Sequence, residues 1–325
     1  MNAALNGKLA TVFGGSGFLG RYVVRALVQR GWRVRAAVRR PDLAGPLQPY
    51  GAVGQIQPVQ ANLRPEFRWS VERAVEGADA VVNLVGILSE WGKQKFDTVQ
   101  AEGAGIVAEA AKAAGIPHLA HVSALAADAD SVSHYARSKA AGEAAVKAGF
   151  PDAVIFRPSV LFGTDDTFLN RFATLATLSP VLPLIGGGKT RFQPVYVADV
   201  AEAIADAIEG KAKSGASYEL GGPRVMSLRQ IFEFILAETG RKRLLLPVPF
   251  ALARLKASVL QLLPNPLLTV DQVRLMTSDS IVSAEAAAAG LTFEGLGIKP
   301  RAIEAIAPSY LWRYRLHGQY DRHPA

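Results

Sequence analysis

Tyr135 and Lys139 have the most chemically suggestive spacing in this chain of 325 residues, within the stretch SHYARSK at 133–139. Side chains four positions apart on a helix share a face, so the phenol and the ammonium group would be neighbours. A free phenol has a pKa of about 10 and is a poor acid or base near neutrality. A lysine cation about 5 Å away would contribute roughly 3 kcal/mol and lower that pKa towards about 8. Because the chain has 8 tyrosines, one such pair means little until the surrounding elements are known.

Short apolar runs alternate with helical patterns through the first half of the chain. Strand-like runs are expected at 9–13, 32–38, 56–60, 80–85, 118–123 and 153–157, and helices at 18–30, 94–114 and 134–148. Strands that alternate with helices require crossover connections, which produce a parallel sheet with both faces covered. The sequence therefore predicts an α/β fold with a Rossmann-type, doubly wound parallel sheet and a smaller C-terminal lobe.

A glycine-rich turn connects the first expected strand to the first expected helix. The glycines are spaced G-x-x-G-x-x-G from Gly14 through Gly17 to Gly20. Such a turn needs residues without Cβ, and the helix N-terminus offers free N–H groups to a pyrophosphate that approaches closely. In this strand–turn–helix context the pattern predicts a dinucleotide site. The residues expected to form it are Gly14, Gly15, Ser16, Gly17, Phe18, Leu19 and Gly20.

The end of the second expected strand indicates which nucleotide binds. A site for NAD usually places an acidic residue there, but this chain has Arg39 and Arg40. Guanidinium groups match a 2′-phosphate, which favours NADPH over NADH. The alternative is that both arginines are ordinary surface residues. Asn62 and Leu63, after the third strand, occupy the position where an adenine contact is expected.

The remaining motifs follow in an order that is specific as a set. Ser123 ends the fifth strand, Tyr135 and Lys139 lie on the next helix, Arg157-Pro158 follows the sixth strand, and VYVADV occupies 195–200. In this order the chain resembles the extended, or atypical, branch of the short-chain dehydrogenase/reductase superfamily.

That resemblance implies roles for individual residues. Ser123 would polarise a substrate carbonyl, Tyr135 would supply a proton, and Lys139 would bind the nicotinamide ribose. The resemblance also implies cofactor contacts after the fourth and sixth strands, at Leu84, Val85, Gly86, Pro158 and Val160. The residue types leave a second interpretation open, in which Tyr135 and Lys139 only bind the ribose of a cofactor that never turns over.

The region 162–197 resembles one subgroup more closely. Its points of match are Phe162-Gly163, Asp166, FLN at 168–170 and QPVYV at 193–197. They resemble the family of NAD(P)-binding accessory subunits of respiratory complex I (NADH:ubiquinone oxidoreductase, alpha-subcomplex subunit nine). This implies a tightly bound NADPH, other complex I subunits as partners, and a mainly structural or assembly role where the peripheral arm meets the membrane. The alternative is a catalytically active NADP-dependent short-chain reductase, or an enzyme like a nucleotide-sugar epimerase, that uses Ser123, Tyr135 and Lys139.

Strand-like residues begin close to Met1, so we expect no targeting segment. This expectation suggests a bacterial homologue, peripheral on the cytoplasmic face of the inner membrane. We expect residues 1–160 to form the dinucleotide-binding domain, with 191–212 returning to it. Residues 161–190 and 213–300 would form the lobe, and 301–325 a basic aromatic tail.

Composition excludes some classes of function. The chain has no cysteine, which excludes disulfides and thiolate metal sites, and its 5 histidines have no metal-ligand spacing, so we expect no metal. The net charge of +8 indicates either a solvated face or an acidic partner. Residues 241–263 combine RKR with an amphipathic pattern that prolines and charges prevent from spanning a membrane. They suit a membrane surface or a partner groove, or alternatively a lobe helix packed on its own core. The aromatic and basic C-terminal residues favour a protein as the binding partner over a nucleic acid.

Overall fold

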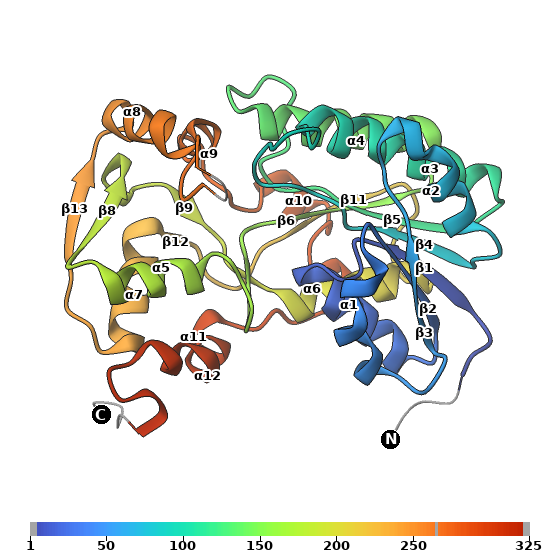
Figure 1. Cartoon of the computed structure of the whole chain (residues 1–325), viewed down its shortest axis with the longest axis horizontal. Helices are drawn as coiled ribbons and strands as arrows, with labels where there is room; N and C mark the ends of the chain where they lie inside the picture. Colours follow the sequence, from blue (N-terminus) through green and yellow to red (C-terminus); the bar gives the residue numbers. More distant parts are fainter. Residues whose placement is uncertain (1–4, 264–265, 321–325) are drawn as a thin grey trace. The chain divides into compact units, whose positions relative to one another are not determined.

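A seven-stranded parallel sheet organises the first of two compact units in the computed structural model, which describes residues 5–263 and 266–320 (Figure 1). The strand order is β11-β6-β5-β4-β1-β2-β3. The strands are β1 (Leu9–Phe13), β2 (Arg33–Val38), β3 (Ile56–Gln60), β4 (Ala80–Asn83), β5 (His118–Val122), β6 (Val154–Pro158) and β11 (Ser217–Leu220). The predicted α/β fold with a doubly wound parallel sheet is confirmed.

Helices cover both faces of this sheet. α2 (Arg68–Val75), α3 (Gly103–Ala113) and α4 (His134–Gly149) lie on one side, and α1 (Phe18–Gln29) and α6 (Val197–Ile208) pack together on the other (Figure 1). The helix expected at 94–114 is divided into a π-helical segment, η4 (Asp97–Glu102), and α3. α4 passes very close to this segment, because a Cβ on Gly142 would lie 2.2 Å from the carbonyl oxygen of Gln100. Wide π turns of this kind are rare and occur frequently at functional sites.

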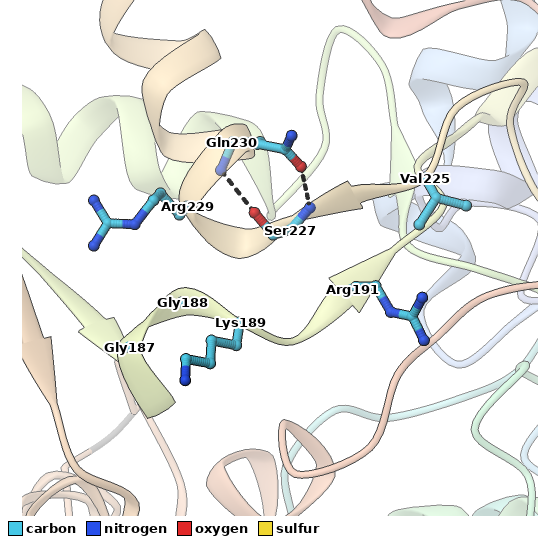
Figure 2. Close-up of a pocket in the computed structure, with 8 residues that line it drawn as sticks. All are labelled: Gly187, Gly188, Lys189, Arg191, Val225, Ser227, Arg229 and Gln230. Atoms are coloured by element: carbon cyan, nitrogen blue, oxygen red, sulfur yellow. Dashed lines mark hydrogen bonds between the residues drawn. The ribbon is translucent and has the colours of Figure 1, made fainter.

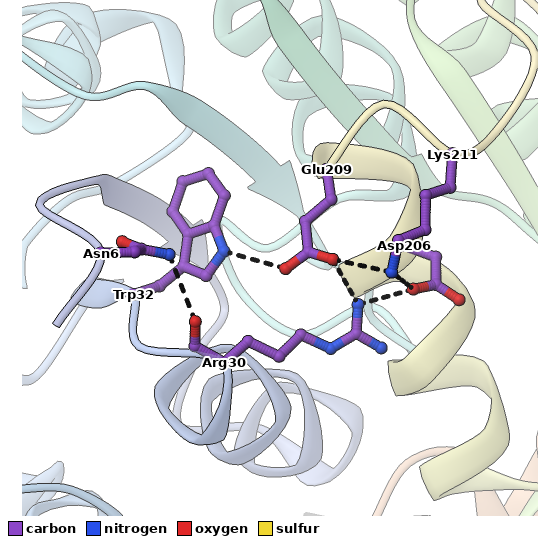
Figure 3. A network of polar contacts seen from close by, with 6 residues as sticks. All are labelled: Asn6, Arg30, Trp32, Asp206, Glu209 and Lys211. Atoms are coloured by element: carbon purple, nitrogen blue, oxygen red, sulfur yellow. Dashed lines mark hydrogen bonds and ion pairs between the residues drawn. The ribbon is translucent and has the colours of Figure 1, made fainter. Parts of the chain in front are cut away.

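A network of ion pairs joins the end of α1 to the end of α6 (Figure 3). The guanidinium of Arg30 lies 2.6 Å from Asp206 and 3.0 Å from Glu209, and Lys211 pairs with the same two carboxylates. The indole of Trp32 donates to Glu209 at 3.3 Å. Because Trp32 immediately precedes β2, this network lies at the edge of the sheet where the strands begin. The network stabilises the edge where the strands begin. It does not occupy the opposite edge, where the strands end.

In the described part of the chain, the second compact unit consists of residues 159–196, 221–263, 266–283 and 299–320. It contains three two-stranded pairs: β7 (Leu161–Phe162) with β10 (Val195–Tyr196), β9 (Arg191–Phe192) with β12 (Met226–Ser227), and β8 (Val181–Ile185) with β13 (Leu244–Val248). Its helices include α5 (Leu169–Leu178), α7 (Leu228–Thr239), α8 (Phe250–Leu260), α9 (Val270–Leu275), α11 (Ile303–Ile306) and α12 (Pro308–Leu311). The buried carboxylate of Asp166 accepts from Tyr310 Oη at 2.8 Å and from the backbone N–H of Leu169 at 2.6 Å. This contact connects the C-terminal residues to the core of the unit.

The compact units differ from the expected domains in four places. The second unit begins at Ser159 and includes 191–196. Segment 213–300 does not belong wholly to the lobe, because β11 and α10 (Ala284–Ala288) belong to the first unit. The short strand SYEL of β11 has too little apolar character to be found by pattern. Residues 301–320 are not a separate tail, because Tyr310 and Leu311 are buried in the second unit's core. The expected tail residues 321–325 lie outside the described part of the chain.

None of the described helices is both long enough and apolar enough to cross a membrane. Part of the segment 241–263, whose pattern is amphipathic, forms helix α8, which belongs to the second unit.

Candidate dinucleotide site

The ends of five parallel strands bring most of the predicted site residues to one edge of the sheet. Gly14 follows β1, Arg39 follows β2, Asn62 lies after β3, Leu84 follows β4 and Ser123 follows β5. Parallel strands end at the same edge, so side chains and turns that follow them are neighbours there. In doubly wound sheets this carboxyl edge is where ligands bind.

The glycine turn has the geometry that a pyrophosphate requires. Gly14 has φ of 78°, and a Cβ on Gly20 would lie 2.2 Å from the carbonyl oxygen of Gly14. Both positions therefore need glycine so that α1 can start against the turn. Ser16 and Gly17 are exposed, and among the described residues no side chain caps the first N–H groups of α1. These free donors fit an anionic diphosphate.

The two arginines after β2 have different partners. Arg40 is bound by Asp42, with its Nη2 2.7 Å from Oδ2 of that carboxylate. Arg39 instead donates to the neutral Gln94 Oε1 at 2.9 Å. Arg39 thus keeps a positive charge that no described carboxylate offsets. At the end of β3, Leu63 is buried in the core, while Asn62 Oδ1 accepts from the backbone N–H of Arg64 at 3.2 Å.

α4 positions the tyrosine and the lysine. Ser133 caps the helix by accepting from the backbone N–H of Ala136. The ring of Tyr135 packs edge-on against Phe96, with 5.8 Å between their centroids. Lys139 is buried and donates through Nζ to the carbonyl oxygen of Val122 at 3.2 Å, next to Ser123. The residues predicted from the sequence as a Ser-Tyr-Lys set therefore come from the end of β5 and one face of the adjacent helix.

One residue of the Ser-Tyr-Lys set and one residue beside it have features that fit a bound cofactor. The hydroxyl of Ser123 is buried and has no hydrogen-bond partner in the described structure. A buried hydroxyl without a partner costs free energy, so a ligand that bonds to it would relieve the penalty. A Cβ on Gly86 would lie 3.2 Å from Lys139 Nζ, so glycine keeps the approach to the ammonium open. A nicotinamide ribose bound here would be held by Lys139 and Tyr135.

Burial dominates the electrostatics of the site and overturns one expectation. The pKa of Tyr135 is raised by desolvation to about 12, although part of its surface reaches solvent, and it is not lowered towards 8 by Lys139. The pKa of Lys139 is lowered to about 8, chiefly by desolvation, while Glu143 opposes the shift. The expectation of an acidified phenol considered the charge of the lysine and omitted the cost of removing both groups from water.

Lys139 gives a pH-dependent prediction for the chain without nucleotide. Between about pH 8 and the ordinary lysine pKa of 10.5, the unfolded chain binds more protons at this position, so stability rises with pH. Below pH 8 the buried cation opposes folding. We expect Lys139→Met to raise the free energy of unfolding at pH 7 by about 1–2 kcal/mol, with the gain lost near pH 10.5. Urea unfolding at both pH values measures this.

The matched control for that experiment is Lys147→Met on the same helix, whose side chain is exposed. It should change stability little at either pH. A Lys139→Met variant that is equally destabilised at both pH values would contradict the prediction, because the Lys139 side chain would then stabilise the fold whether or not its amine is charged.

Three buried polar residues near the set were missed by sequence reasoning. Gln100 donates to Ser138 Oγ at 2.9 Å, and its Oε1 is buried without a partner among the described residues. Glu143 is paired with Arg157 through contacts of 2.8 and 2.6 Å. His121 is fully enclosed, and burial lowers its pKa to about 3. Glu143 could have been found from the sequence, because a residue four positions after Lys139 lies on the same face of a helix. Gln100 could not, because its segment was expected to be regular helix.

Two predicted contacts come from the end of β6 and beyond. Pro158 ends that strand and is buried in the first unit, whereas Val160 belongs to the second unit. The first unit alone therefore holds every predicted cofactor residue except Val160. In the described part of the chain, no cluster of three or more His, Asp or Glu side chains could hold a metal ion.

A pocket of about 460 Å³ lies in the second unit and contains none of the predicted site residues (Figure 2). Three of its lining residues are cationic, but Arg191 pairs with Asp279 at 2.7 Å and Arg229 lies 3.9 Å from Glu233. The pocket is lined by Gly187, Gly188, Lys189, Arg191, Val225, Ser227, Arg229 and Gln230.

The parallel sheet, the glycine turn and the Ser-Tyr-Lys set define a Rossmann-type nucleotide-binding protein of the extended short-chain dehydrogenase/reductase class. The chain belongs to the NAD dependent epimerase/dehydratase family, whose model matches residues 10–221.

Known proteins resemble the chain to different extents. It is 35% identical over 328 residues to "NADH dehydrogenase [ubiquinone] 1 alpha subcomplex subunit 9, mitochondrial" of Arabidopsis thaliana, covering 97% of this chain and 80% of that protein. It is 38% identical over 193 residues to the "Ceramide reductase" of Caulobacter vibrioides, covering 59% of this chain and 58% of that protein. An NADPH-dependent quinone oxidoreductase from Escherichia coli, in complex with NADPH, has a similar fold, with a TM-score of 0.73 at 22% identity over 93% of this chain and 99% of that one.

Proposed function

We propose that this chain is an NAD(P)-binding accessory subunit of respiratory complex I with a mainly structural or assembly role. The observation that carries the proposal is the 35% identity to a complex I subunit along 97% of the chain. The site geometry supports the nucleotide part of it. The glycine turn and the buried Lys139 amine support a dinucleotide site within one unit.

The nucleotide that we propose is NADPH. Arg39 supports this choice because its guanidinium donates to the neutral amide of Gln94 and pairs with no carboxylate of the described residues, whereas the charge of Arg40 is offset by Asp42. An unpaired guanidinium at the end of β2 is suited to a 2′-phosphate. Arg39, and not Arg40, is therefore the residue that we propose to select the phosphorylated cofactor.

Arg39→Ala is expected to weaken NADPH binding by about tenfold to a hundredfold and to leave NADH binding nearly unchanged, because only NADPH loses a charged hydrogen bond. Calorimetric titration with each nucleotide measures both affinities. Arg40→Ala is the matched control and should have the smaller effect. An equal loss for both nucleotides in Arg39→Ala would contradict the proposed role in selection.

The same proposal includes other complex I subunits as partners, a membrane-surface contact through 241–263, and a peripheral position on the cytoplasmic face of a bacterial inner membrane. It is tested by tagging the chain in its source cells, solubilising the membranes in mild detergent and isolating complex I. The chain should co-purify with the complex in fixed proportion. Recovery of the chain only as a free protein, with a fully assembled complex in its absence, would refute the proposal.

A second candidate function is an NADP-dependent reductase of a carbonyl compound. Its specific support is that Ser123, Tyr135 and Lys139 are all present, with the Ser123 hydroxyl left without a partner. A relative named as a ceramide reductase supports a long-chain lipid as the substrate class. Reduction would place the carbonyl oxygen at the Ser123 hydroxyl, with Tyr135 giving the proton. NADPH, when bound, would supply the hydride.

A further inference from the structure

Helix α8 buries small residues and exposes several large apolar ones, which is the opposite of a helix that packs its apolar face on a core. Its buried residues are the small Ala253 and Ala257, which are 2% and 0% exposed. Phe250 and Leu260 are only partly buried, and three other large apolar residues point to solvent: Leu252 is 44% exposed, Leu255 67% and Val259 67%. Because the alanines are buried and the leucines are exposed, most of the helix's apolar surface stays in contact with water. Packing within the second unit therefore does not explain this sequence.

The exposed residues form a regular pattern. Leu252, Leu255 and Val259 are spaced by three and four positions, which places them along one face of the helix. Leu262 and Leu263, directly after the helix, are 75% and 52% exposed. In strand β13, which leads into α8 (Figure 1), Leu244 and Leu246 are 64% and 50% exposed. Isolated exposed leucines are common, but a run of this length marks an interaction surface.

The charges within the segment that carries this apolar face are all of one sign, and the next acidic residue along the chain is Asp271 at the start of α9. Residues 240–270 contain five Lys or Arg residues and no Asp or Glu. Lys242, Arg254 and Lys256 are exposed, and no carboxylate in the described structure pairs with them. Two copies of such a surface would repel each other, which disfavours self-association. Cationic side chains that flank an apolar helix face are instead complementary to a layer with negative headgroups over hydrocarbon.

We propose that the face of α8 formed by Leu252, Leu255 and Val259 inserts into an anionic phospholipid surface, with Arg254 and Lys256 at the headgroups. This inference deepens the membrane contact in the proposed function by assigning the residues and the lipid charge. α8 would lie in the plane of the interface with its alanine face held by Val248 and Val273 of the second unit. The leucines would then be buried in hydrocarbon, where their size is an advantage.

Vesicle flotation of the purified full-length chain tests the proposal. We expect binding to vesicles of phosphatidylcholine with about one third phosphatidylglycerol, and much weaker binding to phosphatidylcholine alone. Leu255→Ser with Val259→Ser should lower the partition coefficient at least about tenfold, because two apolar groups no longer enter the lipid. Arg254→Gln with Lys256→Gln should remove most of the preference for anionic vesicles.

The matched control is Leu43→Ser with Val53→Ser, which changes two exposed apolar residues of the first unit. It should bind vesicles like the unaltered chain, and all variants should keep the same melting temperature because the changed side chains are exposed. Unchanged binding of the Leu255 and Val259 variant would overturn the proposal. So would absence of vesicle binding, or a solution dimer that this variant dissociates. The assay uses the chain alone, so its failure leaves membership of complex I, tested by co-purification, undecided.

Discussion

Replacing Gly20 with alanine is expected to abolish NADPH binding and to lower the free energy of unfolding by about 3 kcal/mol. The added Cβ would lie 2.2 Å from the carbonyl oxygen of Gly14 and 2.7 Å from the backbone of Gly15. These atoms are backbone and belong to the turn that we propose to hold the pyrophosphate. The start of α1 must therefore move, and its free N–H groups move with it. Calorimetric titration and urea unfolding measure the two effects.

Two other glycines separate the loss of binding from the loss of folding. A Cβ on Gly17 would meet only the Gly14 carbonyl oxygen, at 3.2 Å, so Gly17→Ala should keep most of its stability and still obstruct the exposed phosphate side of the turn. A Cβ on Gly45 would meet nothing within 4 Å, so Gly45→Ala should change neither property. Normal NADPH affinity in Gly20→Ala would refute the assignment of the turn.

The parts of the fold that depend on local pattern could be predicted from the sequence. β1 and β3 begin and end at the expected residues. β1 is a short apolar run that ends in glycines. Ser123, Tyr135 and Lys139 were singled out because the order of motifs along the chain resembles the extended short-chain dehydrogenase/reductase superfamily.

Features that depend on distant contacts could not be predicted. The π turn at Gln100 exists against Gly142 of another helix, and no residue within 94–114 indicates it. β11 is held in the sheet by pairing with β6, and its own four residues are half polar. The pKa of Tyr135 likewise depends on how much protein surrounds it. Local spacing predicted which groups meet, but it did not predict how much water they lose.

Tyr135→Phe is expected to reduce carbonyl turnover about a thousandfold if the chain acts as a reductase, because the phenol is the only proton donor of the Ser-Tyr-Lys set suited to the role. With a pKa of about 12, the phenol stays protonated throughout the neutral range and is ready to donate. Its acidity is low, so transfer depends on the neighbouring Lys139 cation. Because the pKa of Lys139 is about 8, the rate should fall as pH rises through 8. NADPH oxidation with a carbonyl substrate, followed from pH 6 to pH 10, measures this.

The same variant separates the two candidate functions, because catalysis and ribose binding make different demands on Tyr135. Phenylalanine keeps the edge-on packing against Phe96 and removes only the hydroxyl. NADPH affinity should therefore fall by no more than about tenfold, the value of one hydrogen bond. A chain that only holds the cofactor would show this small loss of affinity with no turnover to lose, and its association with complex I would persist. Unchanged turnover in Tyr135→Phe would instead show that the proton comes from another group, and the Ser-Tyr-Lys set would then be a binding site alone.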